Sequence, residues 1–270
     1  MVIPMGVMGA ALVTVFSQVV SAVLVLAVLL RLPKDIALHF SAIRLESYLI
    51  RRILVIGVPA GLQFVTFDLA NLLIQSGVNS FGSAMVAAFT AYGKADGLSW
   101  MVSGAFGVSI TTFVGQNFGA QKYDRIRKGT WICLGMCVTM IGTLTAVIVL
   151  LRRQILGFFT ADPQMLRIGA YIMLWTVPFN AILSPMEIFG GAMRGTGNSL
   201  LPTVITGVCI CLFRVVWLFT VVARFHTVEM LLVLYPLSWI LTAVVFTVVY
   251  LRGKDAFCLR KRRMKHGKRK

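Results

Sequence analysis

Seven long apolar stretches constrain the fold of this chain more than any other feature of its sequence. They lie at residues 4–30, 53–76, 84–114, 130–151, 168–190, 201–223 and 229–251. A helix needs about 20 apolar residues to cross the hydrocarbon core of a bilayer. The stretches are continuously apolar instead of alternating, which excludes a closed β-barrel. The sequence therefore predicts an all-α integral membrane protein with about seven transmembrane helices, the last six forming one bundle.

Composition and charge agree with a membrane environment. Hydrophobic residues make up 58% of the chain and charged residues 13%, whereas a soluble domain carries about 25% charged residues. The net charge is +17, and ten of the lysines and arginines follow Leu251. No aromatic interleaving accompanies this basic tail, so we expect contact with anionic lipids and no binding of nucleic acid.

The lysines and arginines between the stretches predict the orientation. They concentrate in segments 31–52 and 115–129, at Arg194 and in the tail. The positive-inside bias then places these segments and the C-terminus in the cytoplasm, as in a multi-pass protein of the plasma membrane. Seven spans that end inside begin outside, without a cationic leader, so we expect this chain to be the C-terminal half of a longer protein.

The same pattern divides the chain into four parts. Residues 1–30 form one transmembrane helix, residues 31–52 a cytoplasmic amphipathic linker, residues 53–252 a six-helix transmembrane bundle, and residues 253–270 a basic cytoplasmic tail.

Two motifs carry a family resemblance. The segment 57–129 contains VNSFGSAMVAAFTAYGKADGL and TTFVGQNFGAQKYDRIRKG, and segment 190–203 reads GGAMRGTGNSLLPT. Both resemble the second half of the multidrug and toxic compound extrusion (MATE) family. The resemblance implies one of two six-helix bundles around a central cavity. It also implies a secondary antiporter that exports drugs, toxins or metabolites, such as organic cations or amphipathic compounds, in exchange for H⁺ or Na⁺. The first bundle, which carries an essential acidic residue in many members, is missing from this chain.

Ionisable side chains at bilayer depth are the candidates for coupling transport to a cation, because each costs about 3 kcal/mol on insertion scales. Asp68, Asp96 and Glu187 are the acidic candidates, and the family resemblance favours the position of Asp68. A hairpin turning near Asn79 brings Asp68 within about a helical turn of Lys94. This pair is either a salt bridge that a cation breaks or a permanent structural link. Asp96 either lines a cavity or neutralises Lys94.

The cavity and gate candidates are polar residues elsewhere in the bundle: Gln63, Asn71, Lys94, Arg194 and Arg214. Glu187 and Arg194 lie two helical turns apart, so they can clamp the cytoplasmic mouth. The glycines after Glu187 predict a turn that starts soon after it. Arg214 is expected to contact one of three groups: an acidic side chain, an anionic group of the substrate, or a structural partner within the bundle. Pro178 and Pro185 are expected to kink the fifth stretch.

Two other functions remain open. One is a lipid-linked oligosaccharide flippase of related architecture, which would need a strongly cationic cavity. The other is a membrane fragment or assembly subunit that transports nothing. No catalytic constellation is visible in the sequence, so we expect no enzyme, no metal site and no cofactor beyond H⁺ or Na⁺ as the coupling ion.

Overall fold

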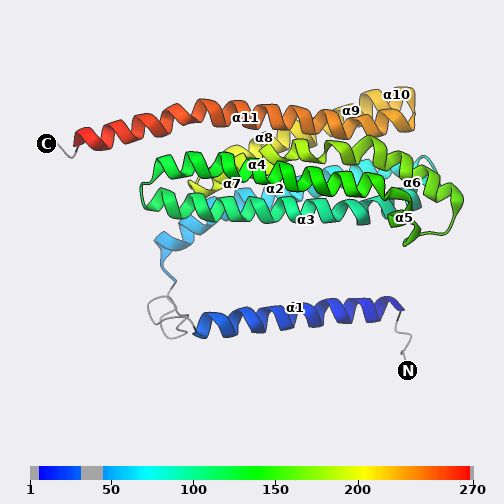
Figure 1. Ribbon diagram of the computed structural model, residues 1–270, viewed down its shortest axis with the longest axis horizontal. Coiled ribbons are helices and arrows are strands. Elements are labelled where there is room, and N and C mark those ends of the chain that lie inside the picture. The colour runs from blue at the N-terminus through cyan, green and yellow to red at the C-terminus, as the bar shows by residue number, and fades with distance from the viewer. Residues whose placement is uncertain (1–5, 32–44, 268–270) are drawn as a thin grey trace. The chain divides into compact units, whose positions relative to one another are not determined.

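The computed structural model describes residues 6–31 and 45–267, with residues 6, 7, 10 and 254–267 described by their backbone alone. These residues form helices and turns, and no β-strand occurs among them (Figure 1). Seven helical segments of the described chain are long and apolar enough to cross a membrane. The predicted fold class is confirmed. The chain divides into two units, Met1–Arg51 and Arg52–Lys270, and each is described here by itself.

Helix α1 (Gly6–Arg31) accounts for most of the first unit. Its transmembrane window contains no buried residue. Valine and leucine cover every side of this helix, so lipid or another polypeptide must serve as its solvent. Residues 32–44 of the predicted amphipathic linker lie outside the described residues, and the last part of that linker, from Ser47 onward, already belongs to the next helix.

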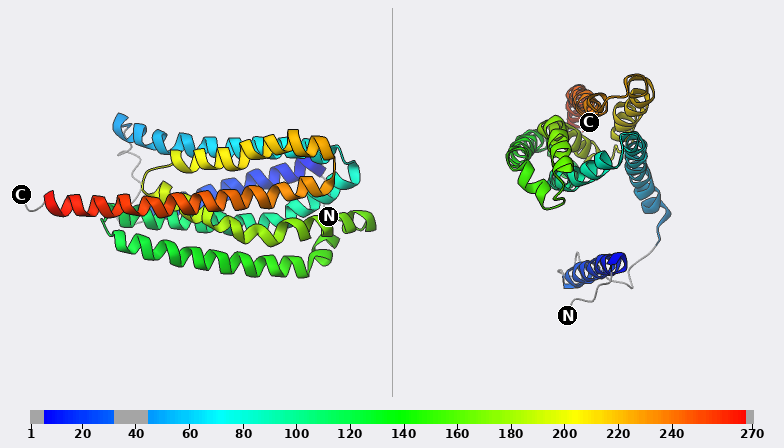
Figure 2. Two further views of the ribbon diagram at one scale, coloured as in Figure 1. Left: turned by 90° about the horizontal axis from the view of Figure 1, so that it is seen from above. Right: turned by 90° about the vertical axis from the view of Figure 1, so that its right-hand side faces the viewer.

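The second unit is a bundle of long helices that lie along one axis (Figures 1 and 2). Its long continuous helices are α2 (Ser47–Asn79), α3 (Ser83–Gly119), α4 (Tyr123–Leu150) and α11 (Val228–Gly267). A short helix, α5 (Arg152–Gly157), follows α4.

The two remaining spans change helix type along their length. The first consists of α6 (Pro163–Thr176), the 3₁₀ segment η2 (Val177–Leu183) and α7 (Ser184–Gly195). The second consists of α8 (Leu200–Thr206), the π-helix η3 (Gly207–Leu212), α9 (Phe213–Trp217), the π-helix η4 (Leu218–Val222) and α10 (Ala223–Phe225).

Helix α7 packs closely against α3 through glycines, and this corrects one prediction. The glycines after Glu187 were expected to begin a turn, but the helix continues to Gly195. At Gly191 an added Cβ would lie 2.7 Å from the Gly107 carbonyl oxygen, and at Gly195 it would lie 2.6 Å from that of Thr111. Absent side chains therefore allow the two backbones to touch, as small residues do in membrane helix pairs.

Prolines shape two spans. Pro178 lies at the start of η2 and Pro185 at the start of α7, so the predicted distortion of this span takes the form of a 3₁₀ segment between them. Pro59 lies inside α2 and cannot donate a hydrogen bond to the carbonyl of Val55. The hydroxyl of Ser199, on the turn before α8, lies 3.4 Å from that carbonyl and donates to it instead.

A seam of hydrogen bonds continues from this point between α2 and the α8–α10 span, which lie side by side in Figure 2. The hydroxyl of Thr203 lies 2.8 Å from the Pro59 carbonyl oxygen. The amide of Gln63 donates to the Thr206 hydroxyl at 2.8 Å. These contacts place the polar residues of α2 against the neighbouring span.

Candidate functional site

Asp96 is the buried carboxylate of the bundle and the centre of the candidate site. Its residue is 4% exposed. The Asn180 amide donates to its Oδ1 at 2.6 Å, and the Trp100 indole donates to its Oδ2 at 3.0 Å. The Tyr92 hydroxyl lies 3.4 Å from Oδ2 as a third, longer donor. All three donors are neutral, so the carboxylate is hydrogen-bonded but has no cation beside it in the described part of the chain.

Helix geometry explains this arrangement. Tyr92 and Trp100 lie four residues before and after Asp96 on α3, so their side chains share one face of the helix with the carboxylate. Asn180 comes from η2, where the 3₁₀ geometry between the two prolines presents its side chain to α3. The sequence reasoning missed Asn180; the available signal was an amide between two prolines in an otherwise apolar stretch.

Two oxygen atoms on residues near Asp96 in the fold lack a hydrogen-bond partner. They are the Ser99 hydroxyl and the Asn180 amide oxygen, both buried. A cavity of about 10 Å³ lies against both residues and against Trp100 and Ser103. That volume is at the lower limit for one water-sized species. Asp96 does not line this cavity, but Asn180 and Trp100 do, and both donate to its carboxylate. The donors to the carboxylate therefore border a space of limited volume.

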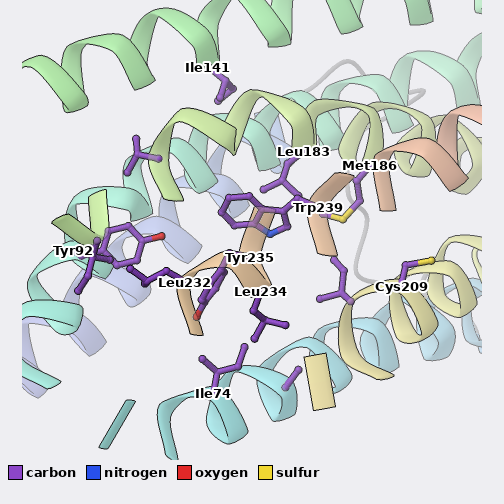
Figure 3. Packing of buried hydrophobic residues seen from close by; sticks show 14 of the residues in the cluster. Ile74, Tyr92, Ile141, Leu183, Met186, Cys209, Leu232, Leu234, Tyr235 and Trp239 are labelled. Carbon is purple, nitrogen blue, oxygen red and sulfur yellow. The ribbon is translucent and has the colours of Figure 1, made fainter. Parts of the chain in front are cut away.

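Aromatic rings surround this site on the side of α11. The Tyr235 and Trp239 rings lie 5.7 Å apart between centroids, and the Trp239 ring lies 6.5 Å from that of Trp100. Figure 3 shows Tyr92, Tyr235 and Trp239 together in the bundle interior. Through Trp100, this aromatic cluster lies next to the donors that surround the carboxylate.

Arg214 lies beyond Tyr235 and is also buried, at 1% exposure. Its guanidinium lies over the Tyr235 ring at 4.7 Å. It donates to the Ser238 hydroxyl at 3.1 Å and to the Asn71 amide oxygen at 3.3 Å. No carboxylate among the described residues forms an ion pair with it. The structure thus gives Arg214 structural partners on α2 and α11, not the acidic partner that was one of the predicted options.

Asp68 and Lys94 do not form the predicted pair. Both side chains are exposed, and no ion pair joins them in the part of the chain that the structure describes. The hairpin between α2 and α3 turns at 80–82, close to the predicted place. The spacing along a hairpin predicts at which level of the membrane each residue lies, but not how each helix is rotated about its axis. Here the rotation of α2 and α3 leaves both charged side chains exposed.

Glu187 and Arg194 form the predicted pair within α7. Their charged groups are 3.9 Å apart, with side chains 21% and 22% exposed. The Glu187 carboxylate lies against Gly107 of α3, where no side chain intervenes. Arg194 also reaches the amide oxygen of Gln63 on α2, at 3.5 Å. The pair therefore connects α7 with both α2 and α3. No group of three or more His, Cys, Asp or Glu side chains that could hold a metal ion occurs among the described residues.

Comparison with curated proteins gives multidrug resistance proteins among the relatives of this chain. YoeA of Bacillus subtilis, a probable multidrug resistance protein, is 27% identical over 207 residues, which cover 75% of this chain and 44% of YoeA. A probable multidrug resistance protein NorM of Thermotoga maritima is 27% identical over 231 residues, which cover 82% of this chain and 48% of NorM. The chain spans about half the length of these curated relatives.

Solved structures share the fold. The crystal structure of a variant of the Vibrio cholerae MATE transporter VcmN matches with a TM-score of 0.81 at 17% identity, covering 93% of this chain and 57% of that one. A MOP superfamily transporter from Pyrococcus furiosus matches with a TM-score of 0.82 at 17% identity, covering 95% and 57%. The family model MatE matches residues 59–220. The resemblance inferred from the motifs is confirmed, and the chain belongs to the MatE family.

Proposed function

We propose that this chain forms the second bundle of a secondary antiporter that exports drug-like compounds in exchange for H⁺ or Na⁺. Its curated relatives are named as probable multidrug resistance proteins, and its family model covers most of the bundle. The bilayer, anionic lipids at the basic tail and a small organic cation or amphipathic compound are its proposed partners. The positive-inside bias supports a plasma-membrane location with a cytoplasmic C-terminus.

The observation that carries the proposal is the buried carboxylate of Asp96. A carboxylate offers about four lone-pair sites on its two oxygens. Oδ2 receives two donors and Oδ1 receives one. One site on Oδ1 is left for the coupling cation. Buried oxygens without a hydrogen-bond partner occur on Asn180, which donates to Oδ1, and on Ser99, three residues further along α3. A proton needs only that lone pair, whereas Na⁺ also needs the neighbouring oxygens.

Coupling requires that the cation affinity differ between the outward and inward states. Asn180 is the donor that can change, because it lies on a 3₁₀ segment bounded by prolines while the other two donors share a helix with Asp96. A shift of η2 relative to α3 removes one donor from Oδ1 and alters the cation affinity. Glu187 and Arg194, at the far end of the same span, supply the gate of an alternating-access cycle.

The test is efflux of a fluorescent organic cation from cells that make the native gene product. Asp96→Asn keeps the shape of the side chain but removes its charge, and we expect efflux to fall by about tenfold or more. Asp68→Asn is the matched control, because it removes the same charge from an exposed position. Equal loss in the two variants, or loss only in Asp68→Asn, contradicts the assignment of Asp96. Unchanged efflux in both variants also contradicts it. If cells that make the wild-type product show no efflux above background, the product transports nothing.

A flippase for lipid-linked oligosaccharides is less well supported. Such a protein needs cations facing its cavity to hold a pyrophosphate. Arg214 is enclosed by Tyr235, Ser238 and Asn71, which leaves Lys94 as the mid-span cation with an exposed side chain. The efflux assay separates the two functions, since a flippase does not export the organic cation.

A further inference from the structure

A second hollow lies between α3 and α4, away from Asp96. Its volume is about 480 Å³, and its lining includes two cations and several apolar side chains. The apolar side chains include Ile110 and Phe113 from α3 and Ile132 and Met136 from α4. The cations are Arg125 and Lys128, both on the first two turns of α4. The hollow is thus apolar along its length and cationic at one end.

The shape of this groove depends on Gly129. A Cβ at Gly129 would overlap the Phe113 ring. Because that carbon is absent, the ring can approach α4 at Gly129 and line the groove, while Ile132 remains 63% exposed and Met136 58% exposed. Arg125 and Lys128 are three residues apart, so their side chains leave the same face of α4.

The position of the two cations points to the class of ligand. They follow directly after the turn between α3 and α4, which the positive-inside bias places at the cytoplasmic surface. That is the depth of lipid headgroups, and the apolar part of the groove then extends into the acyl-chain region. No carboxylate of the described residues pairs with either cation. Two cations at the mouth repel an organic cation and attract a phosphate group.

We propose that this groove binds one anionic phospholipid, with its headgroup phosphate between Arg125 and Lys128 and one acyl chain along Ile132 and Met136. The ligand differs from the exported compound in charge and in location. The site also differs from the basic tail, since it has an apolar wall of defined shape and lies on helices of the bundle. It therefore holds a lipid in a fixed place against the hairpin of α3 and α4.

The experiment is native mass spectrometry of the purified full-length gene product, titrated with phosphatidylglycerol or with phosphatidylcholine of the same acyl chains. We expect one phosphatidylglycerol to bind more tightly than the others. Arg125→Gln with Lys128→Gln is expected to weaken this first binding by about tenfold or more, since each cation near anionic headgroups contributes about 1 kcal/mol. The control is Lys122→Gln with Arg127→Gln, which removes equal charge from neighbouring positions outside the groove.

A second pair of variants tests the apolar wall without changing charge. Met136→Trp puts a bulky ring into the path of the acyl chain and is expected to weaken the first phosphatidylglycerol binding by about tenfold. Met140→Trp is the control, because Met140 lies one turn further along α4, is 52% exposed and does not line the groove. The basic tail is intact in all variants, so it contributes equally to each.

The proposal is overturned if both charge variants weaken binding equally, which would mean that only the net charge matters. It is also overturned if Met136→Trp binds phosphatidylglycerol as the wild type does, or if phosphatidylcholine binds as tightly as phosphatidylglycerol. Efflux need not change in any of these variants, so the result is independent of the role assigned to Asp96.

Discussion

Replacing Gly191 by alanine tests how closely α7 packs on α3. The new Cβ would lie 2.6 Å from the Ile110 Cγ2 atom, 2.7 Å from the Gly107 carbonyl oxygen and 3.0 Å from the Thr111 hydroxyl. Real Cβ atoms essentially never approach other atoms more closely than 3.0 Å. The helices must therefore separate by about 0.5 Å or more, which stretches the 3.1 Å hydrogen bond from Thr111 to the Gly191 carbonyl.

The expected free energies do not cancel. Overpacking a core costs about 1–3 kcal/mol, and a weakened interhelical hydrogen bond costs about 0.6 kcal/mol in a membrane protein. Alanine gains about 0.5–1 kcal/mol over glycine within a helix. The net loss is about 1–3 kcal/mol. For a protein of this size it corresponds to a fall in Tm of about 2–12 °C.

The assay is thermal unfolding of the purified protein in detergent, followed by circular dichroism. Gly135→Ala on α4 is the matched control, since nothing lies within 4 Å of a Cβ built at that position. We expect its Tm to stay the same or to rise. If Gly191→Ala and Gly135→Ala unfold at the same temperature, the two helices are not in the close contact that the structure describes.

Three further predictions concern neighbouring parts of the bundle. Arg214→Lys is expected to lower the stability by about 1–3 kcal/mol more than Arg214→Met, because lysine keeps the buried charge but loses the planar contact with Tyr235; equal Tm values would refute this. Glu187→Gln is expected to change the stability by no more than about 1 kcal/mol, because the pair with Arg194 is long and partly exposed, while efflux falls; a large loss of Tm would make the pair structural instead. Ser199→Ala is expected to lower the stability of the wild type by about 0.5 kcal/mol. It should have no effect in a Pro59→Ala background, because the new N–H of Ala at position 59 donates to the Val55 carbonyl. Additive losses of stability in this double-mutant cycle would contradict the link.

The transmembrane helices could be predicted because lipid imposes a simple rule on sequence. Most residues of a span must be apolar, so a long and nearly continuous apolar stretch identifies it whatever its neighbours are. The Glu187–Arg194 pair could be predicted for a similar reason, because a spacing of seven residues puts two side chains on one face of a helix.

The arrangement around Asp96 depends on contacts that no local pattern specifies. Asn180 is 84 residues away from Asp96 in the chain, and only the packing of η2 on α3 brings them together. The rotation of α2 and α3, which separates Asp68 from Lys94, is also set by packing. The expected turn after Glu187 was wrong because glycine permits both a tight turn and a close contact between helices. A glycine at position 191 is compatible with either arrangement, and only the structure shows that α3 packs against it.

The central claim is that Asp96 binds the coupling cation, and the indole of Trp100 reports on it directly. The Trp100 indole N–H donates to the Asp96 carboxylate at 3.0 Å. Its signal in the ¹H–¹⁵N spectrum of the purified protein is assigned by its loss in Trp100→Phe. We predict a saturable shift of this signal when the pH is lowered or Na⁺ is added, whichever is the coupling ion. The shift should be absent in Asp96→Asn and retained in Asp68→Asn. A shift that persists in Asp96→Asn, or a wild-type signal that responds to neither cation, would contradict the account.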